Sequence, residues 1–363
     1  MLMTEKYNIK RILIGIVILS GITVLPAKSQ NDSLDYLYAV TDTLDDDIIL
    51  FDKDDPLEIT LAFDITQYRK NRQKDEYLDA TLTYHISTTD SVVRILKVRP
   101  RGISRRSICS FPPLLLNFRK QDSPEEEFSS INKIKMVTHC IAGGDEYLLK
   151  EFLVYKLYNI LTDYSFRVRL LRVTYINTHK ESKPIQQFAF VIEPDKTLIE
   201  RVNSGKEAIS YMTQKHIRPE VMDRTAIFNY MIGNTDWSVP IRHNVLVLTG
   251  DNPYVLGSGV VVPYDFDYAG FVNTHYAVPY EGLGLKSVIE RRYLGVCRSE
   301  EVFSDALKEF SEKKEEFYKT INEFPYLNAR SKKKMINYLK TFYKGFNKRN
   351  TIVNILRGEC IDF

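Results

Sequence analysis

Alternating hydrophobic and polar positions predict half-buried strands in the first half of the chain. In Leu57–Phe63 every second residue is large and apolar, which is the period of a strand with one face against a core. Six further segments are predicted strands, of which 78–87 and 91–98 alternate in the same way, and a short strand is expected over 48–51. The six segments are 78–87, 91–98, Leu114–Phe118, 131–138, 166–176 and 186–192.

The spacing of apolar residues changes to a helical period in the second half. Leu149, Phe152, Leu153 and Leu157 recur at helical intervals after an Asp145 that can cap a helix. Pro219 can begin a second helix, and Gly233 can end it. The last eighty residues also have a mostly helical pattern, strongest over 302–324 and 331–346. A β-rich part followed by a helical part predicts an α+β fold.

The segment between these helices carries the candidate chemistry. A hairpin is predicted from 245–248 and 259–262, and it would fold the loop at Asp265 back beside the loop at Asp236 and Asn244. Their oxygen atoms suit Mg²⁺ or Mn²⁺ that also holds phosphates. Phosphoryl transfer needs one carboxylate to orient the attacking hydroxyl and others to hold metal. The alternative is a pair of capped turns, since Asn, Asp and Gly are common turn residues.

A phosphate-binding lysine and its glutamate partner should then lie upstream. Lys135 lies on a predicted strand and is the candidate for the phosphate contact. Glu146 points toward the apolar side of the next helix, where it could pair with Lys135. Glu151 is the second candidate, because the face toward a cleft need not be the face toward the core. The alternative for Lys135 is a solvated strand face.

An arginine-rich segment lies between two predicted strands. Arg101 and Arg105 flank Gly102, which permits unusual backbone angles, so this segment could cover a phosphate group. The alternative is an exposed, charged strand edge that resists aggregation.

Over residues 94–270 the chain resembles the CotH spore-coat kinases, a secreted family with an atypical protein-kinase-like fold. The similar motifs are the Arg101–Arg105 segment, Lys135, the Asp236 to Asn244 loop and Tyr264-Asp265-Phe266-Asp267, which stands where the family has Trp-Asp-x-Asp. The loop is wider than in protein kinases, which have five residues from Asp to Asn.

This resemblance implies a two-lobed kinase-like fold, with a β-rich N-lobe with one long helix over 57–192 and an α-rich C-lobe over 193–363. It implies ATP and a divalent metal as cofactors and a protein substrate. Asp236 and Asp265 would be catalytic, and Asp265, Asn244 and Asp267 would hold the metal.

The first residues predict export. Lys6, Lys10 and Arg11 precede an apolar run over 12–27, and small residues follow at Ala27 and Ser29. This pattern is typical of a signal peptide over 1–29, here followed by an acidic lead-in over 30–56. The protein would then be periplasmic or extracellular, with no later membrane span. An uncleaved anchor is the alternative, although the run is short for a span.

Charge and cysteine content narrow the function classes further. The net charge of +3 comes entirely from residues 1–29, so the rest of the chain is neutral and a nucleic-acid binder driven by bulk charge is not expected. The four cysteines allow three full pairings, or they stay free in the core. None has the spacing of a zinc site.

Three functions remain open on the sequence. The first is a secreted phosphotransferase that acts on a protein or another envelope acceptor. The second is a catalytically inactive pseudokinase or an envelope binding module, because the chain lacks a His-Arg-Asp signature. The third is a metal-dependent phosphoesterase built from Asp236, His243, Asp265 and Asp267.

Overall fold

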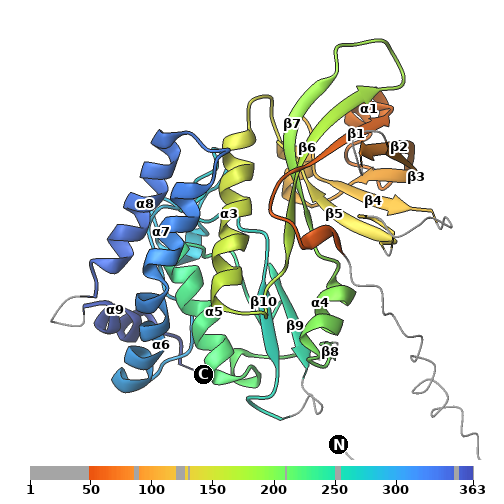
Figure 1. Ribbon diagram of the computed structural model, residues 1–363. Coiled ribbons are helices and arrows are strands. Elements are labelled where there is room, and N and C mark those ends of the chain that lie inside the picture. The colour runs from red at the N-terminus through yellow and green to blue at the C-terminus, as the bar shows by residue number, and fades with distance from the viewer. Residues whose placement is uncertain are drawn as a thin grey trace, which may run out of the picture. The chain divides into compact units, whose positions relative to one another are not determined.

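Seven strands form a closed barrel in the first part of the chain (Figure 1). The computed structural model describes residues 49–85, 90–119, 127–129, 131–208, 211–249, 255–346 and 351–362. The order around the barrel is β1-β2-β3-β4-β5-β7-β6, and parallel pairing of β1 with β6 closes it. The strands are β1 Leu57–Phe63, β2 Leu78–His85, β3 Ser91–Pro100, β4 Leu114–Phe118, β5 Lys133–Val137, β6 Val168–Asn177 and β7 Ile185–Ile192.

The barrel closes around its own apolar core. Leu57, Ile59, Leu61 and Phe63 of β1 are all buried, as their alternation predicts. The inward residues of the other strands complete this cluster, which includes the fully buried Tyr175 of β6.

The second part of the chain is mainly helical and contains a small antiparallel sheet, ordered β10-β9-β8. The strands are β8 Lys206–Glu207, β9 Val245–Thr249 and β10 Val260–Pro263. The helical elements of the whole described chain, in order, are η1 Ile49–Phe51, α1 Ile65–Lys70, α2 Ser104–Ile108, α3 Asp145–Leu161, α4 Asp195–Val202, η2 Gln214–His216, α5 Pro219–Ile232, η3 Glu281–Leu283, α6 Glu300–Glu312, α7 Lys314–Glu323, α8 Ala329–Tyr343 and α9 Thr351–Glu359.

Helix α3 runs between the barrel and the helical part (Figure 1). Its Phe152 contacts Phe190 of β7 at 5.9 Å between ring centroids and Phe324 after α7 at 5.8 Å. Because both sides of α3 are covered, the helix buries charged residues that a surface helix would expose, among them Glu151. Ile48–Phe363 thus form one compact unit with two apolar cores.

The predicted mixed α+β fold, β-rich first and helical afterwards, is confirmed. Residues 49–51 form a 3-10 turn, so the strand predicted over 48–51 is wrong. The helix predicted over 302–324 is two helices, because the chain bends at Lys313. The signal peptide over 1–29 and most of the acidic lead-in lie outside the described residues. No described helix has the length and apolar character of a membrane span.

The cysteines form two disulfides, Cys109–Cys140 and Cys297–Cys360. The prediction left three pairings and free thiols open, and only the folded chain decides among them. Both bonds are compatible with an exported protein, since disulfides persist in oxidising compartments.

Gly233, which ends α5, should tolerate no side chain. Its φ is +66°, and an added Cβ would overlap the Tyr338 hydroxyl. Gly284 has a similar φ of +64° but open space around it. We expect Gly284→Ala to cost about 1 kcal/mol of unfolding free energy through backbone strain alone, and Gly233→Ala to cost about 2–4 kcal/mol. Urea denaturation measures both losses, and equal losses would contradict the packing argument.

Candidate active site

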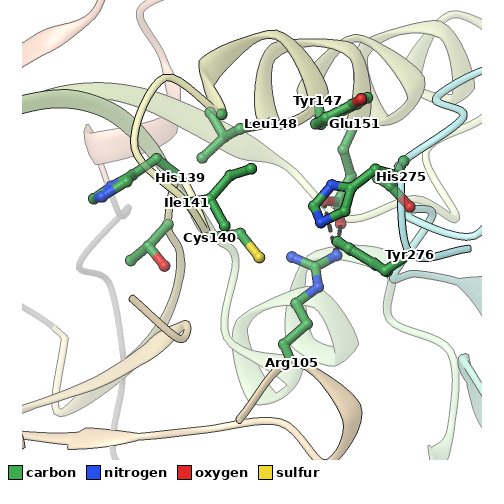
Figure 2. Close-up of a pocket in the computed structure, with 12 residues that line it drawn as sticks. Arg105, His139, Cys140, Ile141, Tyr147, Leu148, Glu151, His275 and Tyr276 are labelled. Carbon is green, nitrogen blue, oxygen red and sulfur yellow. Dashed lines mark hydrogen bonds and ion pairs between the residues drawn. The ribbon is translucent and has the colours of Figure 1, made fainter. Parts of the chain in front are cut away.

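One arginine joins the barrel side of the site to the helical side. Arg105 of α2 places Nη2 at 2.9 and 2.8 Å from the two carboxylate oxygens of Glu151 on α3. The same nitrogen lies 2.9 Å from Asp265 Oδ1, and Nε lies 2.7 Å from Asp267 Oδ2. Figure 2 shows the guanidinium of Arg105 directed toward Glu151 and flanked by Tyr276. Three carboxylates thus converge on one buried cation.

The charges in this cluster shift one another's pKa. Burial acts to lower the pKa of Arg105, but Asp267 and Glu151 hold it well above its usual value, so Arg105 stays charged. Burial raises the pKa of Glu151 to about 8, against the opposing effect of Arg105. At neutral pH Glu151 therefore carries a proton much of the time, and the two aspartates balance most of the charge of Arg105.

The two aspartates differ in access to solvent. The side chain of Asp265 is 42% exposed and that of Asp267 only 5%. The hydroxyl of Tyr276 donates a hydrogen bond of 2.9 Å to Asp267 Oδ2, so this carboxylate is occupied by protein donors. The backbone N–H of Asp265 donates to the hydroxyl of Tyr155 at 2.9 Å, and the φ of Asp265 is +60°. A left-handed backbone at a non-glycine residue is strained, and such strain is concentrated at functional sites.

The predicted hairpin of β9 and β10 brings the loop at Asp265 beside the loop at Asp236 and Asn244. Asn244 Nδ2 donates to the backbone oxygen of Asp236 at 2.8 Å and to its Oδ2 at 2.9 Å. His243 Nε2 lies 2.7 Å from Oδ1 of the same carboxylate. Tyr264 N–H donates to the Asn244 carbonyl at 3.0 Å, which ties the two loops together. Partial loss of solvent raises the pKa of Asp265, and the negative charges of Asp267 and Asp236 raise it further.

The predicted pairing of Lys135 with Glu146 or Glu151 is wrong. Lys135 Nζ lies 2.7 Å from Oδ1 of Asp195, at the start of α4, and 5.5 Å from the centre of the Tyr264 ring. Glu146 pairs instead with Lys150 one turn along α3, at 2.6 Å. Lys135 alternates with the buried Ile134 and Met136, so it faces away from the barrel core and meets Asp195 instead.

Arg101 belongs to the same side of the site as Arg105. Its positive charge lowers the pKa of Asp265, and its own pKa is lowered by burial and raised by Asp265. The structure therefore brings Arg105, Glu151 and Asp265 into contact, with the charge of Arg101 close enough to act on Asp265. Glu146 lies outside this group.

Some of the predicted oxygen ligands are accessible enough to hold a small divalent cation, and one is not. Asp265 is 42% exposed and Asp236 34% exposed, and Asn244 lies beside Asp236. Mg²⁺ in proteins often takes one or two carboxylates and completes its shell with water and phosphate oxygens. Asp267 does not fit as a ligand, because Arg105 and Tyr276 hold it. Within the described residues no three His, Cys, Asp or Glu side chains are arranged to bind a metal by themselves.

Several residues of the site carried no usable signal in the sequence. Tyr155 and Tyr276 contact the aspartates from α3 and from the segment after Asp267. Twenty-three tyrosines occur in the chain, so a tyrosine without a motif cannot be singled out. Asp195 follows Pro194 at the start of α4. Acidic residues are common there because they interact favourably with the helix dipole, so Asp195 did not stand out as a partner for Lys135.

The sequence matches no model of a protein family and no curated protein. Among solved structures, the chain is similar to the Helicobacter pylori proinflammatory kinase CtkA, with 11% sequence identity and a TM-score of 0.35. The similarity covers 72% of this chain and 94% of that one. The chemistry of the site therefore rests on its own side chains.

The raised pKa of Glu151 predicts a pH-dependent stability. A carboxyl that ionises near pH 8 in the folded state and near its usual value in the unfolded state favours folding only while protonated. Stability from Glu151 is therefore present at low pH and is lost as pH rises from about 5 to 8. Urea unfolding should show that the free energy of unfolding falls less between pH 5 and pH 8 in Glu151→Gln than in the wild type.

Glu146→Gln is the matched control on the same helix. Burial acts to raise the pKa of Glu146, but its hydrogen bond to Lys150 lowers it below the usual value. A lowered carboxyl pKa cannot cause a loss of stability as pH rises. In Glu146→Gln the free energy of unfolding should fall with rising pH as much as it does in the wild type. An equally steep fall in Glu151→Gln would show that other groups cause the pH dependence.

Proposed function

We propose that this protein is an exported, kinase-like phosphotransferase that uses ATP and a divalent cation and phosphorylates a hydroxyl of a protein acceptor. The carrying observation is the contact of Arg105 with both Glu151 and Asp265. In protein kinases a cation from the N-terminal sheet pairs with a helix glutamate opposite a metal-binding aspartate. Here Arg105 supplies the cation, Glu151 the glutamate and Asp265 the aspartate.

The loop at Asp236 and Asn244 supports the same chemistry. Asn244 and His243 hold the carboxylate of Asp236 in one orientation while leaving it partly exposed. In this position Asp236 can orient the acceptor hydroxyl and accept its proton as the oxygen attacks phosphorus. Asp265 and Asn244 would hold the divalent cation, whose chemistry would be to neutralise phosphate charge. Arg101 lies on the same side and is available to phosphate oxygens.

The proposed location rests on two features. The first residues have the pattern of a signal peptide, and the folded part has two disulfides, which agree with an oxidising compartment. The resemblance to the secreted CotH kinases supports the same place and chemistry. The acceptor would then be a protein of the envelope or the surroundings.

An inactive binding protein is the second candidate, and one observation favours it. Arg105 already occupies the carboxylates of Asp265 and Asp267, and Lys135 is held by Asp195. A site whose charges are satisfied internally binds a nucleotide only if these ion pairs rearrange. Such a protein would keep the kinase-like arrangement without the reaction.

Substitution of Asp265 tests the proposed reaction. Transfer of labelled phosphate from ATP with Mn²⁺ to casein, used as a general acceptor, should fall at least about 100-fold in Asp265→Ala, because the exposed cation-binding carboxylate is lost. Asp305→Ala removes the same charge from the exposed surface of α6 and should leave transfer unchanged. Full transfer in Asp265→Ala would discard the assignment.

Ligand binding separates the candidate functions. A phosphotransferase should show a higher melting temperature with millimolar ATP and Mn²⁺, because a ligand that binds only the folded state stabilises it. The absence of both a shift and phosphate transfer would favour the inactive protein. Release of free phosphate without any acceptor, lost in His243→Ala, would favour a phosphoesterase instead.

A further inference from the structure

The Cys109–Cys140 disulfide joins the two elements that meet at Arg105. Cys109 directly follows α2, which carries Arg105, and Cys140 lies in the turn between β5 and α3, which carries Glu151. The two Cα atoms are 4.5 Å apart, although the residues are separated by 31 positions in the sequence. A covalent bond therefore spans the same two elements as the ion pair of the site.

Helix α2 is too short to hold its own position. It has five residues, its N-cap Ile103 makes no capping hydrogen bond, and the side chain of Ile103 is 93% exposed. Isolated helices shorter than about 12 residues are marginal in water. The N–H of Cys109 donates to the carbonyl of Arg105 at 2.8 Å, so Cys109 lies one turn beyond Arg105. Anchoring Cys109 thus anchors the backbone from which Arg105 extends.

The ion pairs of Arg105 give little net stabilisation by themselves. The attraction between buried charges is largely offset by the cost of removing them from water. Backbone contacts near the disulfide add to the anchoring, because Phe111 N–H donates to the Cys140 carbonyl at 2.9 Å. That contact lies beyond Cys109, on the side away from Arg105. The disulfide is the covalent anchor nearest to α2.

We propose that the Cys109–Cys140 disulfide is a positioning link for Arg105, so that phosphate transfer requires this bond to be oxidised. The inference rests on the function proposed above. Arg105 contacts the residues of the site directly, whereas the two cysteines act through it. Arg106 also holds α2 from the other side, through the Arg72 carbonyl at 2.7 Å and Asp75 at 3.0 Å. Opening the bond would leave α2 tied on that side alone and loosen the fit of Arg105 against Glu151, Asp265 and Asp267.

The two cysteines differ in exposure, so a dithiol reductant would attack Cys140 first. Cys140 lines the same pocket as Arg105, Tyr147 and His275 and is partly exposed, whereas Cys109 is 1% exposed (Figure 2). One thiolate of the reductant attacks Cys140 Sγ, the S–S bond breaks, and Cys109 leaves as a thiolate that takes up a proton. The second thiolate of the reductant releases Cys140 in the same way. The reductant loses two electrons and becomes a cyclic disulfide, while the protein gains two thiols.

The second disulfide provides a matched control. Cys297–Cys360 joins the segment before α6 to the end of α9 in the helical part. The double variants Cys109→Ser/Cys140→Ser and Cys297→Ser/Cys360→Ser each remove one bond. The first should lose at least about 10-fold in the rate of transfer from ATP with Mn²⁺ to casein, and the second should lose less than twofold.

Limited trypsin digestion reports on α2 without any nucleotide. Arg105 and Arg106 are trypsin sites that a well-held α2 protects, and Arg105 is buried. Mass spectrometry should show cleavage after these residues at least about 10-fold faster in Cys109→Ser/Cys140→Ser, with no change in the control variant. Unchanged cleavage together with unchanged transfer would overturn the proposal. Faster cleavage with a wild type that transfers no phosphate would support the link and reject the enzyme.

Linkage distinguishes positioning from general stability. If the bond and the site are coupled, ATP with Mn²⁺ must make Cys109–Cys140 harder to reduce, because coupling between two sites is reciprocal. Wild-type protein is titrated with dithiothreitol, with and without ATP and Mn²⁺, and the reduced cysteines are measured by alkylation and mass spectrometry. The ligand should make the reduction midpoint of Cys109–Cys140 more negative and leave that of Cys297–Cys360 unchanged. This experiment uses the native chain, so it stands even where a serine variant does not fold. Equal midpoints with and without ligand, in a protein that binds ATP, would overturn the coupling.

Discussion

The site depends on one buried cation that contacts three carboxyl groups from two separate parts of the chain. Arg105 reaches Glu151 on α3 and both aspartates after β10, so the barrel and the helical part are joined by charge as well as by apolar contact. Removing such a partner would leave carboxylates buried without compensation, which costs far more than the pair contributes. Burial, acting against Arg105, raises the pKa of Glu151.

Helix α3 makes this arrangement possible because both of its sides are covered. One side packs on β7, the other on the helical part, and Glu151 lies in the dry region between. The aspartates reach the same region from a loop whose backbone is held by Tyr155. Charge, burial and backbone geometry therefore together fix the positions of Glu151 and the two aspartates. The partly exposed side of the site rests on α3, which is packed on both sides.

Much of the fold could be predicted from local patterns. The strand Leu57–Phe63, the strand Leu114–Phe118 and the helix Pro219–Ile232 have the predicted bounds, because alternation, turn residues and a terminal proline or glycine act within a few positions. The hairpin that brings Asp236 beside Asp265 was also predictable, since adjacent strands with a short connection pair with each other. Short helices such as α2 and the break at Lys313 have no comparably strong local signal.

The sequence by itself determined which residue types could carry charge and metal, and which segments form strands and helices. Only the tertiary structure decided which cation meets which carboxylate: Arg105, not Lys135, pairs with Glu151, and Cys109 pairs with Cys140. The physical reason is distance along the chain. Periodicity reports the face of an element, whereas the closure of the barrel and the packing of α3 set which faces meet, and these depend on contacts between residues far apart in sequence.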